Sequence, residues 1–231
     1  MPFWSGIVSI SKVESHILPS MTSLKVVVAG PKSGKSTVVN YLSQSNSNNI
    51  NDIIYQNKIG KKDTIYLPTI GCRIIECDSQ SILISQEDDN DHFRDTYPPI
   101  IEFWDVSSNP DYEKCWPAIM EDCDALLLMY NPMDPTGSDE ITMWFQELTK
   151  LTTLSNTNKK RLDARRCLVL MHGEEEDVGI PSGWKRPHGM DGVSMHKTTF
   201  SDGVELKRHV SSFLRQIATS KSKSNGTGEV L

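Results

Sequence analysis

The stretch Ala29-Gly30-Pro31-Lys32-Ser33-Gly34-Lys35-Ser36 decides the fold of this chain of 231 residues. It follows the apolar run 24–28 (LKVVV), which predicts a buried strand, and it precedes a segment of helical character, 35–42. The pattern A/G-x-x-x-x-G-K-S/T between a strand and a helix is that of a phosphate-binding P-loop. Small residues let the backbone curl so that its N–H groups point at phosphate oxygens, and the start of the helix adds partial positive charge.

The side chains of this loop can bind phosphate and a metal ion. We expect Lys35 to contact the β- and γ-phosphates as a point charge and the Ser36 hydroxyl to bind Mg²⁺. The alternative is an ordinary glycine turn with Ser36 as a helix cap, but the flanking strand and helix favour the P-loop. The predicted phosphate-binding residues are Gly30, Pro31, Lys32, Ser33, Gly34, Lys35, Ser36 and Thr37.

Two further positions suit a magnesium site. Thr69 lies in the segment 68–71 (PTIG) before a predicted strand, and Asp105 lies at the end of the hydrophobic strand 100–106. A threonine there can bind Mg²⁺ and sense the γ-phosphate, and a carboxylate at that strand end can hold a metal-bound water. Each residue alone also fits polar surface or a turn. Their order after the P-loop favours a metal set of Ser36, Thr69 and Asp105.

The remaining pattern predicts an α/β fold, a P-loop small G domain whose mostly parallel six-stranded sheet has helices on both faces. Further strands are expected at 74–75, 82–84, 100–106, 125–130, 167–171 and 193–195, and helices at 111–122, 138–151 and 204–217. Ser138 is expected to cap its helix. Trp116 and Ile119 are expected to face inward, and the pair Trp144-Phe145 to belong to the core or an interface.

The chain divides into three parts by composition. Residues 1–23 are polar and predict a flexible extension, although Met21 could also be the start of the protein. Residues 24–218 form the predicted G domain, with a Ser/Asn/Lys-rich insert at 43–63 and an acidic insert at 87–95 that we expect to be a solvated loop. Residues 219–231 predict a flexible tail.

Composition limits the classes of function. The formal net charge of −6 disfavours a broad nucleic-acid or anionic-membrane surface. The five cysteines show no zinc-binding spacing, which favours reduced thiols. Because no cysteine follows Cys167, we expect no prenyl anchor, and no apolar run reaches membrane-spanning length.

Segments beyond the P-loop resemble a known family. Residues 68–71 (PTIG) and 104–105 (WD) resemble the two switch regions of Rab-type GTPases. The segments 103–105 (FWD), 115–120 (CWPAIM) and 140–145, which ends in the aromatic pair WF, are together similar to the Rab-like protein 5 family of the Ras superfamily, small GTPases of the intraflagellar transport B complex. The similarity covers about 24–217.

This resemblance implies properties that composition does not show. It implies GTP and GDP as ligands with Mg²⁺, and docking on two coiled-coil subunits, intraflagellar transport proteins 74 and 81. It also implies a place in the cytoplasm and the cilium or flagellum, and a G domain that is monomeric by itself.

The second switch departs from the family pattern D-x-x-G followed by glutamine. Ser108 replaces the glycine whose backbone N–H meets the γ-phosphate, and Asn109 replaces the glutamine that orients the attacking water. Because asparagine is one methylene shorter, we expect slow GTP hydrolysis. Glu113 is expected to be a helix-surface residue. The predicted catalytic residues are Lys35, Thr69 and Asn109.

The guanine-binding N-K-x-D motif is also missing. The strand 167–171 is followed by an acidic run in which Glu176 or Asp177 could accept hydrogen bonds from guanine N1 and N2. A solvated acidic loop is an equal alternative, and both stay open here. The last base-contact loop corresponds to about 196–199, which makes Thr198 and Thr199 the candidates.

Three functions remain in competition. The first is a GTP-binding adaptor that hydrolyses slowly, and the second is a nucleotide-independent structural subunit with a vestigial P-loop. The third is a P-loop kinase acting on a small metabolite, which needs an arginine-bearing lid. The arginine cluster Arg161, Arg165 and Arg166 precedes a strand and fits such a lid poorly.

Overall fold

The computed structural model describes residues 23–44, 68–79, 82, 100–154, 162–173 and 182–225. Six strands form one sheet in the order β2-β3-β1-β4-β5-β6. Their bounds are β1 Ser23–Ala29, β2 Cys72–Asp78, β3 Ile100–Val106, β4 Ala125–Tyr130, β5 Cys167–Gly173 and β6 Ser194–Thr199. All neighbouring strands are parallel except the antiparallel pair β2 and β3. The prediction of a mostly parallel six-stranded α/β fold is confirmed.

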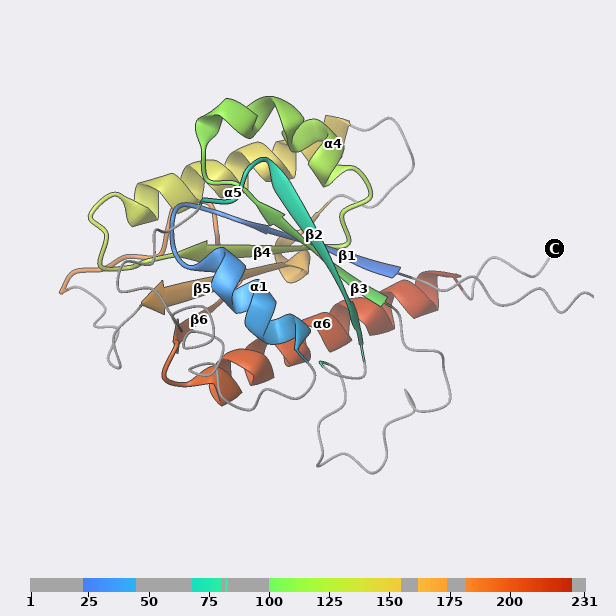
Figure 1. The fold of residues 1–231 in the computed structure, drawn as a ribbon. Coiled ribbons are helices and arrows are strands. Elements are labelled where there is room, and N and C mark those ends of the chain that lie inside the picture. The colour runs from blue at the N-terminus through green and yellow to red at the C-terminus, as the bar shows by residue number, and fades with distance from the viewer. Residues whose placement is uncertain are drawn as a thin grey trace, which may run out of the picture.

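Helices cover both faces of this sheet. Their bounds are α1 Lys35–Ser43, η2 Pro110–Cys115, α4 Trp116–Met120, α5 Gly137–Leu154, η3 Ala164–Arg166 and α6 Gly203–Asn225. Helices α4 and α5 lie on one face, and α1 and α6 lie on the other (Figure 1). Within the described ranges, no helix combines the length and the apolar character needed to cross a membrane.

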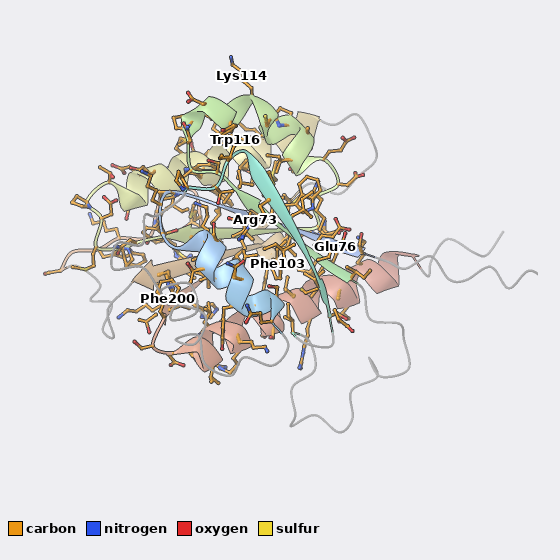
Figure 2. The ribbon with its side chains drawn as sticks, viewed as in Figure 1. Arg73, Glu76, Phe103, Lys114, Trp116 and Phe200 are labelled. Atoms are coloured by element: carbon orange, nitrogen blue, oxygen red, sulfur yellow. The ribbon has the colours of Figure 1, made fainter. Side chains whose placement is uncertain are left out.

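The core has two layers, one on each face of the sheet. The central strands β1, β4 and β5 are buried along almost their whole length, as parallel strands covered on both faces must be. On the α4 and α5 side the rings of Trp116 and Trp144 pack with centroids 4.4 Å apart. Both tryptophans are buried, so they belong to the core as expected, and Figure 2 shows Trp116 beneath Lys114.

The parallel arrangement brings several chain segments to one edge of the sheet. The segments that follow β1, β3, β4, β5 and β6 all leave the sheet at the carboxyl ends of these parallel strands. In open α/β sheets ligands bind outside these strand ends. The P-loop therefore lies beside residues that follow β3, β4 and β6 and beside the last residues of β5.

Three local predictions are corrected. Ile82 is helical rather than part of a strand, because its N–H bonds to the Ser79 carbonyl oxygen in a turn after β2; residues 83 and 84 lie outside the described ranges. The helix expected at 111–122 consists of η2 and α4 and ends at Met120. Helix α5 begins at Gly137, so Ser138 lies in its first turn, and the Thr136 carbonyl accepts the first helical N–H bonds.

The C-terminal elements are longer than expected. Strand β6 extends to Thr199, and α6 continues to Asn225, past the expected domain end at residue 218. Near the end of α6, the Lys221 ammonium donates to the Ser23 carbonyl oxygen at 2.7 Å and to Asp124 Oδ2 at 2.6 Å. The start of β1 and the last turns of α6 are thereby joined. The division of the chain into extension, domain and tail stays a prediction.

Candidate nucleotide-binding site

The P-loop backbone adopts conformations that its two glycines permit. Gly30 has φ 123° and Gly34 has φ 80°, where a side chain causes strain. A Cβ atom on Gly30 would lie 2.3 Å from the Met129 carbonyl oxygen, and one on Gly34 would lie 2.8 Å from Phe200 Cζ. The loop therefore packs its backbone directly against β4 on one side and an aromatic ring on the other.

The ammonium group of Lys35 is held inside this loop. Its Nζ donates to the carbonyl oxygens of Gly30 at 2.7 Å and Pro31 at 2.9 Å, and to the Ser108 hydroxyl. The Ser108 hydroxyl in turn donates to the Gly30 oxygen at 3.1 Å. Burial lowers the pKa of Lys35 to about 8, although the nearby Asp105 charge acts in the opposite direction.

Three oxygen-bearing side chains gather beside Lys35. The Ser36 and Thr69 hydroxyl oxygens are 2.9 Å apart, and the Thr69 hydroxyl lies 3.4 Å from Asp105 Oδ2. Asp105 is fully buried, and its Oδ1 has no hydrogen-bond partner within the described ranges. The three residues predicted as a metal set are therefore adjacent.

This arrangement fits Mg²⁺. Two neighbouring ligands of an octahedral Mg²⁺ with bonds of about 2.0–2.1 Å lie about 2.9 Å apart, and the two hydroxyl oxygens have that spacing. The unpaired Asp105 oxygen is a hard ligand of the kind that Mg²⁺ or its bound water prefers. No cluster of three or more His, Cys, Asp or Glu suits a metal in the part of the chain that the structure describes.

A fourth residue, Arg73, joins this group. Its Nη2 donates to Asp105 Oδ2 at 3.1 Å and to the Ser36 carbonyl oxygen at 3.3 Å. Arg73 lies on β2 (Figure 2). The sequence pattern did not single out this arginine, because its partner is defined by strand pairing and not by a motif.

A cavity of about 260 Å³ opens between the P-loop and the second switch. Asn109 lines it, but its side chain is engaged elsewhere: Oδ1 accepts from the Asp111 N–H at 3.0 Å and Nδ2 donates to Asp111 Oδ2 at 3.3 Å. Asn109 thus caps η2 instead of pointing freely at the phosphate side. The cavity is lined by Lys32, Ser33, Gly34, Lys35, Ser36, Pro68, Thr69, Val106, Ser107, Ser108, Asn109 and Pro110.

A second cavity, of about 330 Å³, lies on the other side of the loop, against the end of β5. Its lining includes His172 and Phe200, whose rings meet edge to face with centroids 4.2 Å apart. His172 Nδ1 lies 3.0 Å from the Thr198 hydroxyl, while the buried Nε2 has no partner among the residues described. Burial lowers the pKa of His172 to about 4, so the ring is neutral at pH 7.

The expected base-contact residues have mixed outcomes. The segment 196–199 is the last part of β6 and not a loop, because it pairs with β5 through Thr199. The Thr198 hydroxyl contacts His172 Nδ1 at 3.0 Å, and the Thr199 hydroxyl accepts from the Asp202 N–H at 3.3 Å. Glu176 and Asp177 lie outside the described residues.

Sequence reasoning missed His172 and Phe200 as site residues. Strand β5 continues to Gly173, so His172 lies inside the strand, next to its last residue, whereas the expected strand ends at Met171. A histidine at the end of an otherwise apolar strand was the available signal. Phe200 lies near the end of β6 (Figure 2), and no motif marks it. Glu113, by contrast, is exposed, as expected.

Several known proteins are similar to this chain in sequence. No protein-family model matches the chain. The bovine intraflagellar transport protein 22 homolog is 27% identical over 214 residues, which cover 91% of this chain and 98% of that protein. The chain is similar to intraflagellar transport protein 22. The human homolog of intraflagellar transport protein 22 is 25% identical over 91% of the chain and 98% of its own length.

Two further comparisons agree with this similarity. The Caenorhabditis elegans intraflagellar transport associated protein 2 is 25% identical over 242 residues, 97% of this chain and 91% of that protein. The structure resembles a chain of the T. brucei IFT22/74/81 GTP-bound crystal structure, with a TM-score of 0.56 and 20% identity over 87% of this chain and 98% of that one. The structural likeness shows the fold, and the intraflagellar transport protein 22 homologs agree with the resemblance inferred from sequence.

Proposed function

We propose that this chain is a GTP-binding subunit of the intraflagellar transport machinery that binds GTP with Mg²⁺ and hydrolyses it slowly. The observation that carries the proposal is the convergence of Lys35, Ser36 and Thr69 around one cavity beside a curled glycine loop, with the buried Asp105 carboxylate 3.4 Å from the Thr69 hydroxyl. These groups supply a cation for the phosphates and hard oxygen ligands for a divalent ion. A Mg²⁺ ion bound there would neutralise charge on the β- and γ-phosphates.

The second cavity suits a purine base. Its lining includes Gly34, Phe200 and His172. With the Thr198 hydroxyl donating to Nδ1, the neutral His172 ring carries its proton on Nε2 and can donate to an acceptor such as purine N7. His172 thereby takes a role that the missing N-K-x-D motif would otherwise fill. Whether Glu176 or Asp177 adds contacts to guanine N1 and N2 is part of the same proposal.

Slow hydrolysis follows from the second switch. The Asn109 carboxamide is occupied by Asp111, and the Ser108 hydroxyl is occupied by Lys35 and Gly30. Neither side chain is free to orient an attacking water. In a single-turnover assay we expect a rate below the intrinsic rate of Ras, about 3–5 × 10⁻⁴ s⁻¹; a rate at or above that value would contradict the proposal.

The proposed partners follow from the relatives. The trypanosome complex contains IFT22 with IFT74 and IFT81 in a GTP-bound state, and we propose the corresponding coiled-coil subunits as partners here. We propose that the protein acts in the cytoplasm and in the cilium or flagellum. Bound nucleotide would order the segments that carry Thr69 and Ser108, and those segments would form part of the docking surface.

Nucleotide binding is tested with purified full-length protein in calorimetry with Mg²⁺, using GTP and ATP in competition. We expect GTP binding in the wild type and its loss in Lys35→Ala. Lys114→Ala is the matched control, because this lysine is exposed (Figure 2). Absence of heat from both nucleotides would contradict the proposal, and tighter binding of ATP would favour the metabolite kinase.

The alternative is a structural subunit that needs no nucleotide. It predicts that Lys35→Ala binds the IFT74/IFT81 coiled coil as tightly as the wild type. The nucleotide-dependent adaptor predicts that this variant binds the coiled coil more weakly, while Lys150→Ala, an exposed position on α5 outside the proposed docking segments, keeps wild-type affinity. A pull-down or calorimetric titration with the two coiled-coil segments separates the two functions.

A further inference from the structure

Arg73 and Asp105 face each other across the first two strands of the sheet. Strands β2 and β3 are antiparallel, and these two residues are directly paired in register. Directly opposed residues project from the same face and lie in contact distance. Strand pairing therefore fixes the ion pair, in which Arg73 Nη2 lies 3.1 Å from Asp105 Oδ2.

The two partners differ in exposure. The Asp105 side chain is 0% exposed, whereas that of Arg73 is 41% exposed. A buried carboxylate is costly unless a cation or hydrogen-bond donors compensate its charge. Arg73 reaches Asp105 from the solvent side and compensates the same carboxylate that the candidate magnesium site needs.

Arg73 also connects three chain segments. The nitrogen that contacts Asp105 donates to the Ser36 carbonyl oxygen in the first turn of α1 at 3.3 Å. Thr69 precedes β2, and its hydroxyl lies 2.9 Å from the Ser36 hydroxyl. Arg73 thus holds the segment that carries Thr69 against the P-loop helix by protein groups alone.

We propose that Arg73 is a built-in counter-cation of the candidate metal site and reduces the dependence of triphosphate binding on a divalent cation. The proposal rests on the nucleotide-binding function proposed above. A positive charge beside Asp105 opposes the entry of Mg²⁺ and weakens the repulsion between Asp105 and the triphosphate. Arg73 therefore lowers Mg²⁺ affinity and raises affinity for the metal-free triphosphate.

The test compares full-length wild type and Arg73→Gln. The Kd of a fluorescent GTP analogue is measured with excess Mg²⁺ and with excess EDTA, and the ratio Kd(EDTA)/Kd(Mg²⁺) is compared. We expect this ratio to be at least about tenfold larger in Arg73→Gln, since one nearby unit charge is removed. Arg165→Gln removes the same charge from an exposed residue of η3, before the N-terminal end of β5, and should keep the wild-type ratio.

A second measurement needs no nucleotide. Mg²⁺ alone should raise the Tm of Arg73→Gln more than that of the wild type, because the Asp105 carboxylate is then open to the ion. Arg73→Lys restores a positive charge and should return the Kd ratio toward the wild-type value. Arg73→Met, a neutral side chain of similar length, replaces the glutamine variant if that variant does not fold.

The outcomes separate the two proposals. If the wild type binds GTP and the neutral variants keep its Kd ratio, the role of Arg73 is wrong while the proposed function stands. The role of Arg73 is also wrong if Arg73→Lys has the same Kd(EDTA)/Kd(Mg²⁺) ratio as Arg73→Gln. If the wild type binds no nucleotide, both proposals fall.

Discussion

The Lys35 ammonium donates a hydrogen bond to the Ser108 hydroxyl, which passes a hydrogen bond on to the Gly30 carbonyl oxygen at 3.1 Å. An ammonium group has three donors. In this structure the carbonyl oxygens of Gly30 and Pro31 and the hydroxyl of Ser108 accept all three. A phosphate oxygen must therefore displace or share one of these acceptors.

Removal of the Ser108 hydroxyl should favour the phosphate. In Ser108→Gly and Ser108→Ala one N–H donor of Lys35 becomes available to the phosphate. Triphosphate affinity should then rise by about two- to tenfold, which corresponds to the contribution of about 0.5–1.5 kcal/mol from one hydrogen bond. Calorimetry with GTP and Mg²⁺ measures the change. Ser108→Ala separates the effect of the hydroxyl from that of the added backbone freedom of glycine. Unchanged or weaker triphosphate binding in both variants would contradict the expectation that phosphate displaces the Ser108 hydroxyl from Lys35.

The pH dependence of binding should reflect Lys35. Burial lowers its pKa to about 8 in the free protein, and a bound triphosphate favours the charged form and raises this pKa. The favourable interaction is therefore complete below pH 8 and declines as the pH rises above it, by at most about tenfold in affinity per pH unit. Titrations between about pH 7 and 9.5 should show this decline. A constant Kd across that range would contradict it.

The role proposed for His172 can be isolated with a modified ligand. 7-Deaza-GTP lacks the N7 acceptor, so the wild type should bind it about two- to tenfold more weakly than GTP, the cost of one neutral hydrogen bond. His172→Ala should bind the two nucleotides equally. Thr198→Val removes the hydroxyl that orients the ring and should reduce the discrimination. If the wild type does not distinguish the two ligands, His172 does not contact N7.

The tight approach at Gly30 should be visible as lost stability. Gly30→Ala places a Cβ 2.3 Å from the Met129 carbonyl oxygen at a φ of 123°. Backbone strain alone costs about 1–3 kcal/mol, which lowers Tm by about 2–4 °C per kcal/mol in a chain of this size, and the clash adds to it.

Gly183→Ala is the matched control for this variant. Gly183 also has a positive φ of 85°, but a Cβ there meets nothing within 4 Å. Gly183→Ala should therefore have the backbone strain without the steric clash, and thermal unfolding should show a smaller loss of Tm than in Gly30→Ala. Equal losses of Tm in Gly30→Ala and Gly183→Ala would mean that the close approach of Gly30 to β4 does not contribute to the destabilisation.

The sequence predicts the fold and the phosphate side of the site because both depend on local patterns. The apolar run 24–28, the spacing from Gly30 to Ser36 and the strand ending at Asp105 each imply their surroundings. Arg73 and His172 become significant only when distant strands pair: Arg73 through its register with Asp105, and His172 through the extension of β5 beside β6. Local sequence patterns do not show which residues of distant strands become neighbours in the sheet.

The strand after residue 193 shows the same limit on a smaller scale. The strand expected at 193–195 continues to Thr199, although residues 196–199 (HKTT) are polar and were expected to form a base-contact loop. Backbone hydrogen bonds to β5 outweigh that preference and place Thr198 inside the sheet, where its hydroxyl meets His172. Tertiary pairing has overridden local propensity here.

The hydrogen bond from Lys221 to the Ser23 carbonyl oxygen joins β1 to α6. Ser23 begins the strand whose opposite end leads into the P-loop. Fluorescent probes placed near these two residues would thus be close together and remote from the nucleotide. Such a pair would report whether α6 stays docked while ligands and partner proteins act on the far end of the sheet.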